Sequence, residues 1–301
     1  MTARLALAAV VVIGLAGCTS AKPDPVPSAT PVPSASIVES AEPSAEPTPT
    51  GEAEPQASPA RSQAPRPPRI TTPPIALNCT GSQPSDRPQA GGAGPLGTVK
   101  TTGNTTVALT FDDGPDPVNT PKVLDLLRQC GVKATFCVNG VKAQANPTLI
   151  RRIHNDGHTL CNHTWKHITQ LGDYGVDLIR QDLTDTNNAI RAIVPDARVP
   201  YFRAPGGRWT ADYLSVCQEL GMTPTHWDVD TRDWESSRWG KGESMVNHIV
   251  GVVQGQTRPG SIVLMHDYQK PDTTTALHTA LPWLKARFTL VALPRDGLPK
   301  P

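Results

Sequence analysis

The sequence predicts an α/β fold in which short parallel strands alternate with helices. Apolar segments of strand length recur along the chain, and amphipathic segments with helix-start and helix-stop residues lie between them. Repeated strand–helix–strand units indicate parallel pairing through right-handed crossovers, which allows either a barrel or an open sheet. The predicted strands are 106–111, 134–138, 158–160, 199–203, 222–227, 261–265 and 288–291.

The helix boundaries follow from proline and glycine. Thr120-Pro121 and Asn146-Pro147 are typical first residues of a helix, and a glycine follows each of these segments about ten residues later. The predicted helices cover 120–131, 146–157, 210–220 and 244–253. In either a barrel or an open sheet, we expect the chemistry at the carboxyl ends of the strands.

The N-terminus predicts export and lipid anchoring. Arg4 precedes an apolar run from Leu5 to Leu15, which is short for a membrane span and typical of a signal peptide. The run ends in Ala16-Gly17-Cys18, which resembles a bacterial lipobox. We therefore expect residues 1–17 to be a lipoprotein signal peptide and Cys18 to carry the lipid at the outer face of the cell membrane. The alternative is an ordinary signal peptide with an incidental cysteine.

Residues 18–104 are predicted to be a disordered linker, and residues 105–301 the catalytic domain. Between residues 19 and 76, 15 of 58 residues are proline, and Ser, Thr, Ala and Glu fill most of the rest. Such a segment buries too little apolar surface to offset the entropy of ordering. The formal net charge of +1 gives no reason to expect a nucleic-acid partner, and we expect a monomer.

Five further cysteines predict disulfides, because they lack the CxxC spacing of a thiolate zinc site and the chain is exported. An odd number leaves at least one free, and 15 arrangements of two bridges are possible. We favour Cys137 with Cys161, which lie on successive predicted strands, and Cys79 with Cys130, with Cys217 left over.

Two polar clusters follow predicted strands and suit a metal ion. Asp112 and Asp113 end the first strand, and His163 and His167 follow the third, four residues apart and on one face if the segment is a helical turn. Each cluster alone has a simpler reading, as a helix-capping turn or as exposed histidines. Together they supply two imidazoles and a carboxylate, which suits Zn²⁺, or Co²⁺, Ni²⁺ or Fe²⁺ in the same geometry.

Three more polar clusters end the later strands. They are Arg203-Ala204-Pro205-Gly206-Gly207, the segment 228–234, and Leu264-Met265-His266-Asp267. A salt bridge or a loop cap could explain any one of them. Five such clusters on the same rim of a parallel sheet predict a catalytic site instead.

Five motifs carry a family resemblance. TFDDGP, HTWKH, RAPGG, DTRDW and LMHD, in this order, resemble those of the NodB-type polysaccharide deacetylases, carbohydrate esterase family 4. The resemblance covers about residues 105–293. It implies a distorted (β/α)7 barrel with a groove across its top and a hydrolase that removes acetyl groups from polysaccharide.

The resemblance also implies a role for each site residue. Asp112 is expected to be the catalytic base, positioned by Arg203, and His266 the general acid, oriented by Asp233. The implied metal ligands are Asp113, His163 and His167, and the implied substrate contacts are Gly206, Trp234 and Leu264. Gly206 departs from the commoner pattern, in which an aromatic residue follows the proline, so one wall of the groove differs.

The lipid anchor favours a polymer near the cell, and the expected substrate is peptidoglycan N-acetylglucosamine. Chitin oligosaccharides and acetyl xylan are the alternative substrates. A catalytically dead glycan-binding module is a further alternative, but it would require the loss of a base, acid or ligand that this sequence retains.

Overall fold

The computed structural model describes residues 76–81, 87–89 and 91–298. The predicted signal peptide, Cys18 and nearly all of the proline-rich segment lie outside the described residues, so the signal peptide, the lipid anchor and the disordered linker stay predictions. Within the described part of the chain, no helix has both the length and the apolar character required to cross a membrane.

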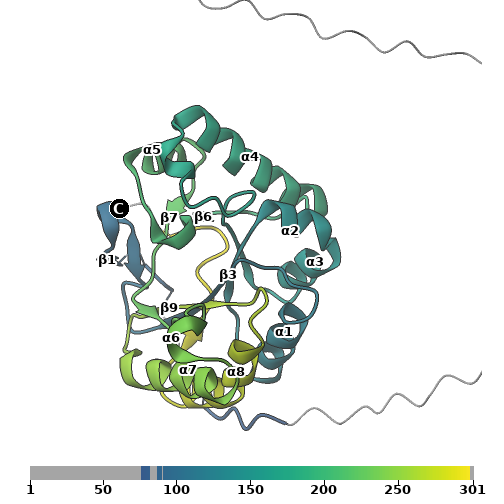
Figure 1. Ribbon diagram of the computed structural model, residues 1–301, viewed down its shortest axis with the longest axis vertical. Coiled ribbons are helices and arrows are strands. Elements are labelled where there is room, and N and C mark those ends of the chain that lie inside the picture. The colour runs from purple at the N-terminus through teal and green to yellow at the C-terminus, as the bar shows by residue number, and fades with distance from the viewer. Residues whose placement is uncertain (1–75, 82–86, 90, 299–301) are drawn as a thin grey trace, which may run out of the picture. The chain divides into compact units, whose positions relative to one another are not determined.

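A curled parallel sheet with helices on its outer face forms the fold (Figure 1). In the described part of the chain, the strands are β1 (Gly91–Ala93), β2 (Val99–Thr101), β3 (Val107–Asp112), β4 (Thr135–Val138), β5 (Thr159–Asn162), β6 (Tyr201–Phe202), β7 (Thr223–Pro224), β8 (Val229–Asp230), β9 (Ile262–His266) and β10 (Leu290–Val291). The helices are α1 (Thr120–Gln129), α2 (Gly140–Ala145), α3 (Pro147–Asn155), α4 (Val176–Ile193), α5 (Ala211–Glu219), α6 (Ser236–Trp239), α7 (Glu243–Gln256) and α8 (Pro271–Lys285). Short 3₁₀ turns are η1 (Pro95–Gly97), η2 (Leu171–Asp173) and η3 (Pro205–Gly207).

The sheet curls far enough to bring its two edges together. Its strand order is β7-β6-β5-β4-β3-β9-β8, and β10 pairs with the start of β3. The edge strands β7 and β8 are joined by residues 225–228 alone, so one extended segment pairs with β6 at its beginning and with β9 at its end. This arrangement is a distorted barrel, as the family resemblance implies.

The folded part begins earlier than residue 105, which corrects the predicted end of the linker. Strands β1 and β2 form an antiparallel hairpin, and Val99 of β2 pairs with Thr225 while Thr101 pairs with Ser261. The hairpin therefore lies against the segment where the sheet closes (Figure 1). The hairpin was not predicted, because it is glycine-rich and three residues per strand are too few to show an apolar period.

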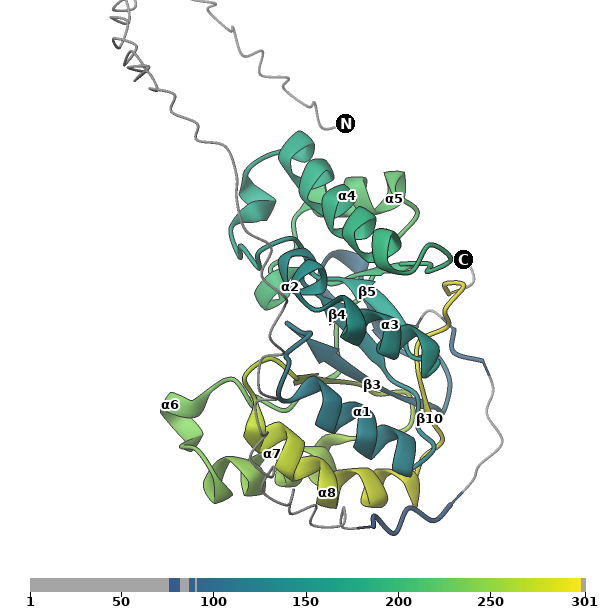
Figure 2. The same cartoon turned by 90° about the vertical axis from the view of Figure 1, so that its right-hand side faces the viewer.

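Each predicted strand and each predicted helix corresponds to an observed element, but strand β8, the short helices α2 and α6 and the long helices α4 and α8 are not among the predicted elements. Asn and Thr residues in α4 and Pro282 within α8 weaken their helix propensity. Burial overrides propensity in both: α4 buries Ile179, Leu183 and Ile190. Helices α1–α3 flank one side of the strands, α4 and α5 a second, and α6–α8 a third (Figures 1 and 2).

Side-chain alternation along the strands decides which residues enter the barrel. In β3, Leu109 and Phe111 belong to the core beneath the helices, whereas Ala108 belongs to a smaller apolar cluster inside the curl. With a period of two, Thr110 and Asp112 face inward as well. The inner cluster draws on the other strands in the same way: it contains Ala108, Cys137, Cys161, Tyr201 and Ile262.

Both favoured disulfides are present. Cys137 of β4 is bonded to Cys161 of β5, and Cys79 is bonded to Cys130 at the end of α1. Among the described cysteines, Cys217 is free and buried. Successive parallel strands thus brought the first pair into contact, as the sequence predicts.

Candidate active site

Inward-facing residues at the carboxyl ends of β3, β5, β6 and β9 converge on one cavity. Each of these residues follows, by an even number of positions, a residue of the inner apolar cluster. Asp112 follows Ala108 by four, and His163 and Arg203 follow Cys161 and Tyr201 by two. The same alternation turns Leu264 and His266 inward, while Met265 belongs to the outer core. The parity of these strands therefore places residues of four of the five motifs around a common centre.

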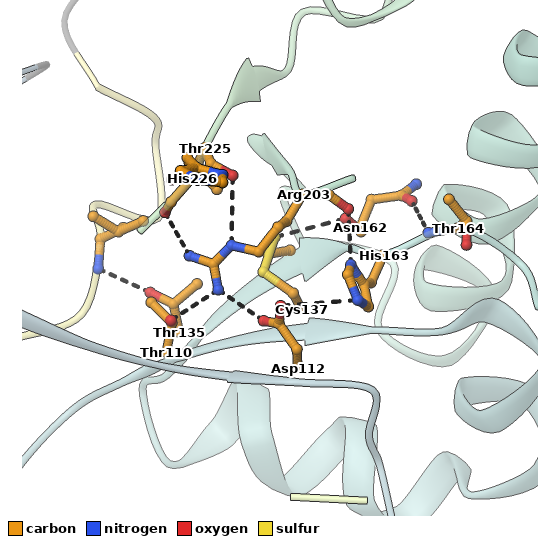
Figure 3. The surroundings of a disulfide bond; sticks show 12 residues. Thr110, Asp112, Thr135, Cys137, Asn162, His163, Thr164, Arg203, Thr225 and His226 are labelled. Atoms are coloured by element: carbon orange, nitrogen blue, oxygen red, sulfur yellow. Dashed lines mark hydrogen bonds and ion pairs between the residues drawn. A yellow bond between two sulfur atoms is a disulfide. The ribbon is translucent and has the colours of Figure 1, made fainter. Parts of the chain in front are cut away.

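A fully buried ion pair joins Arg203 to Asp112 (Figure 3). Nη1 of Arg203 donates to Oδ1 of Asp112 and to Oγ1 of Thr110, both at 2.8 Å. Its Nη2 donates to the carbonyl of His226 at 3.0 Å, and its Nε lies 3.4 Å from the carbonyl of Thr225. These acceptors satisfy the guanidinium, which would otherwise be very costly to bury.

Asp113, His163 and His167 form a cluster that can hold one metal ion. One ligand atom from each lies within 4.8 Å of the other two. Oδ1 of Asp113 is 3.3 Å from Nε2 of His163 and 3.2 Å from Nε2 of His167. Two ligands at about 2.1 Å from a tetrahedral ion are about 3.4 Å apart, so these separations fit a shared cation.

The protonation states also fit a cation. Nδ1 of His163 lies 2.7 Å from the carbonyl oxygen of Arg203, which can only accept, so Nδ1 carries a hydrogen and Nε2 is the ring nitrogen that faces Asp113. Burial lowers the pKa of His167, which favours a neutral ring. Burial raises the pKa of Asp113, but His163, His266 and His167 outweigh it and hold that pKa well below its usual range.

The segment 163–167 is an irregular loop and not the helical turn that the sequence suggested. Thr164 and His167 have φ of 67° and 60°, in the left-handed region. Hydrogen bonds hold this backbone: Asn139 donates to the carbonyl of His163 at 2.7 Å, and the Trp165 amide donates to Asp182 at 2.8 Å. The two histidines therefore converge through fixed loop geometry, a costly conformation that is typical of functional sites.

His266 lies on the other side of the cavity and is held by Asp233. Its Nδ1 is 2.6 Å from Oδ1 of Asp233, and its backbone amide donates to Oδ2 at 2.8 Å. Thr273 donates a third hydrogen bond to the same carboxylate, at 2.6 Å. Burial opposes the charged ring, but the charge of Asp233 and its hydrogen bond raise the pKa of His266 to about 9.

The cavity between these groups has a volume of about 420 Å³. The predicted contacts Gly206, Trp234 and Leu264 all line it, and Trp234 is 47% exposed at its mouth. Gly207 has φ of 67°, and a Cβ there would lie 2.6 Å from the ring of Trp227, so this turn requires glycine. Sequence reasoning missed four lining residues, although all adjoin or lie within the motifs: Ala204, Trp227, Asp230 and Arg232.

Comparison with known proteins identifies the family. A model of the polysaccharide deacetylase family matches residues 99–225. A chitooligosaccharide deacetylase of Sinorhizobium fredii is 41% identical over 208 residues, which cover 65% of this chain and 93% of that protein. The chain belongs to the polysaccharide deacetylase family. A peptidoglycan-N-acetylglucosamine deacetylase of Bacillus cereus is also similar to this deacetylase, at 36% identity over 62% of the chain and 86% of the relative.

Solved structures agree with this family and fold. One is a peptidoglycan N-acetylglucosamine deacetylase crystallised with a substituted N-hydroxybenzamide, which is 34% identical with a TM-score of 0.58 and covers 63% of this chain and 86% of that one. Another is a family 4 carbohydrate esterase from Streptomyces lividans in complex with acetate, which is 31% identical with a TM-score of 0.54 and covers 62% and 91%. A family 4 pseudoenzyme from Bacillus anthracis is similar as well, at 26% identity, with a TM-score of 0.57 and coverage of 65% and 67%.

The Cys137–Cys161 disulfide lies directly beneath this deacetylase site (Figure 3). Cys137 pairs in register with Asp112 on β3 and with Cys161 on β5, two residues before His163. The bond therefore fixes β4 to β5 at the level from which Asp112 and His163 project. The Cys79–Cys130 bond lies at the end of α1 that leads into β4, away from this rim.

We predict that Cys137→Ala/Cys161→Ala lowers the affinity for divalent metal, by about tenfold or more, as loss of a supporting contact does. Cys79→Ala/Cys130→Ala is the matched control. The two bonds close loops with sequence separations of 24 and 51 residues, so each double variant should lose a similar unfolding free energy, about 3 to 4 kcal/mol. Metal titration and denaturant unfolding of both variants measure the contrast, and equal metal affinities would contradict it.

Proposed function

We propose that this deacetylase hydrolyses the acetamido group of N-acetylated polysaccharide in the cell envelope, with peptidoglycan N-acetylglucosamine as its substrate. The observation that carries the proposal is that three kinds of group surround one cavity. They are the candidate metal ligands Asp113, His163 and His167, the carboxylate of Asp112 beside them, and the His266–Asp233 pair opposite. An amide hydrolysis that releases acetate and an amine uses a nucleophile, a base and an acid in such an arrangement.

Asp113, His163 and His167 would hold the metal, and two neutral imidazoles with one carboxylate favour Zn²⁺. A bound divalent ion lowers the pKa of coordinated water and polarises a carbonyl group. The imidazole of His163 is held for this task by its hydrogen bond to the Arg203 carbonyl.

Asp112 is the proposed base. Oδ1 of its carboxylate is occupied by Arg203 at 2.8 Å, whereas Oδ2 lies 3.8 Å from Nε2 of His163 and faces the metal cluster. Oδ2 is therefore the atom placed to accept the proton of the attacking water. The fixed guanidinium prevents the carboxylate from turning away.

His266 is the proposed acid. Asp233 accepts a hydrogen bond from Nδ1 of His266. The proton on Nε2 is then free to be donated to the departing amine nitrogen. The backbone N–H of Gly206 would stabilise the developing oxyanion, a contact whose loss typically costs about 10²- to 10³-fold in rate. Leu264 and Trp234 give the acetyl methyl group an apolar wall.

The choice of peptidoglycan rests on similar proteins and on the predicted anchor. Relatives are named as chitooligosaccharide and peptidoglycan-N-acetylglucosamine deacetylases, and a lipid on Cys18 would hold the enzyme beside the cell wall. A similar structure is named as that of a family 4 pseudoenzyme, so the fold also occurs without catalysis. The presence here of the base, the acid and the three candidate ligands around one cavity supports catalysis.

We predict that the two adjacent aspartates fail in different ways on N-acetylated glycan. Asp112→Asn is nearly isosteric and leaves Asp113 and both histidines in place, so bound metal should remain while turnover falls about 10²- to 10⁴-fold. Asp113→Asn removes a charged ligand, so it should lower both metal content and activity, and excess metal should partly restore it. Metal content and rate are measured for both variants. Near wild-type turnover of Asp112→Asn, or equal loss of metal, would refute the assigned roles.

The acid role predicts a shift of the alkaline limb of the pH–rate profile. The raised pKa of His266, about 9, means that the ring is protonated below that pH and loses its proton as pH rises through it. Asp233→Asn removes the charge that raises this pKa, so the limb should move to lower pH. A bound cation would lower the pKa of His266 in the wild type and in the variant alike. The quantity measured is therefore the difference between the two alkaline limbs. Thr273→Val leaves the charge in place and should shift the limb less; an unmoved limb in Asp233→Asn excludes His266 as the acid.

We also propose that the enzyme acts outside the cytoplasm, attached to the cell membrane through Cys18. Cys18→Ala in the full chain should move the protein from the membrane fraction to the soluble fraction and leave its activity on glycan unchanged, because the long proline-rich segment separates the anchor from the barrel. Labelling with a fatty-acid analogue tests this directly. Wild-type protein that takes up no label would show that Cys18 is not lipidated.

A further inference from the structure

A second cavity, the side cleft, opens beside the catalytic cavity. Its volume is about 610 Å³, within the range of small-ligand sites. It lies between the β1–β2 hairpin, the segment that joins β7 to β8, and helices α6 and α7. Trp227, Asp230 and Arg232 line both cavities, so the side cleft shares a wall with the catalytic cavity and is its immediate neighbour.

Stacked aromatic pairs line the side cleft. The rings of His226 and Trp227 stack with centroids 3.9 Å apart, and those of Trp239 and His248 do the same at 3.9 Å. The C–H faces of a pyranose ring are apolar and pack against an indole ring. The hydroxyls of the sugar can form hydrogen bonds with the polar side chains of the cleft. The stacking also fixes the orientation of both tryptophans before a ligand arrives, which lowers the entropy cost of binding.

Charge in the side cleft favours an anionic ligand. Its acids are already engaged: Asp228 accepts from Arg258 at 2.7 Å and from Ser261 at 2.9 Å, and Asp230 accepts from the Arg232 amide at 2.8 Å. Of its cations, Arg232 is paired with Glu235 at 2.9 Å.

Arg238 is the cation that remains available. Its guanidinium lies 4.7 Å from the ring of Trp239, and within the described residues no acid lies within ion-pair distance of it. Lys100 reaches into the same cleft, 4.0 Å from Asp228. An unpaired guanidinium held over an aromatic ring is suited to bind a carboxylate.

We propose that the side cleft binds the carboxylate-bearing sugar next to the N-acetylated sugar being hydrolysed, with Arg238 as the anion contact. This inference rests on the proposed function. In peptidoglycan, alternate sugars carry a lactyl ether whose carboxyl group is either free or extended by an acidic peptide, whereas chitin carries no such group. The side cleft therefore selects peptidoglycan over neutral N-acetylated glycans.

The test compares glycans that differ only in charge. Wild type and Arg238→Ala are assayed on peptide-free peptidoglycan strands, on the same strands after conversion of their carboxyl groups to amides, and on peptide-bearing strands. Arg287→Ala is the matched control, because Arg287 lies 4.4 Å from the ring of Trp283 as Arg238 lies over Trp239, but it does not line the side cleft.

Arg238→Ala should lower kcat/KM on the acidic strands about tenfold, mainly through KM, as loss of a charged hydrogen bond does. It should leave the amidated strands unchanged, which also shows that the variant is folded. Arg238→Lys should retain part of the effect, and Arg287→Ala should retain all of the activity. A loss confined to peptide-bearing strands would assign the carboxylate to the peptide, and a loss on peptide-free strands would assign it to the lactyl group.

Equal losses on acidic and amidated strands, or no loss on either acidic form, would overturn the side-cleft inference and leave the proposed function standing. Wild-type enzyme that deacetylates none of these strands would overturn the proposed function, and the inference with it.

Discussion

The buried ion pair between Arg203 and Asp112 is the interaction on which the rest of the site depends. Burying a charge without partners is prohibitive, so this guanidinium needs every one of its acceptors. They come from Thr110 and Asp112 on β3, and from the carbonyls of residues 225 and 226, where the sheet closes on itself. The closure of the barrel and the orientation of the Asp112 carboxylate are therefore one structural requirement.

The backbone of Arg203 extends this coupling to the metal cluster. Its carbonyl accepts a hydrogen bond from Nδ1 of His163, so the residue that fixes Asp112 also fixes the tautomer of a candidate ligand. The Cys137–Cys161 bond reinforces the same level of the sheet from below. A cluster built on strands, supported by a second layer of contacts, can keep its ligand geometry before any cation or substrate arrives.

The two sides of the cavity are kept electrostatically distinct. The side with the cluster has a carboxylate at low pKa and a histidine that burial keeps neutral, which suits a cation. On the opposite side, Asp233 stabilises the protonated form of His266. His167 and His266 thus have pKa values shifted in opposite directions although both are histidines, because burial dominates at the first and the charge of Asp233 at the second.

The sequence by itself predicted the α/β fold class, most of the strands and their parallel pairing, the residues of the candidate metal cluster and, as the favoured choice among 15 arrangements, the two disulfides. These follow from local signals: the apolar period of each strand, the Pro and Gly boundaries, and the polar residues at strand ends such as Asp113 and His163. The sequence did not show α4 or α8, where the burial of residues such as Ile179 outweighs weak propensity.

Only the tertiary structure decided how those residues meet. The loop geometry that turns His167 toward Asp113 is held by Asn139 and Asp182, far along the chain, so no helical spacing could reveal it. The β1–β2 hairpin and the side cleft were likewise invisible, because both depend on where the curled sheet closes. Local sequence determines which polar residues lie at the end of each strand. Which strand ends face one another depends on the curl of the sheet, and this curl is a property of all the strands together.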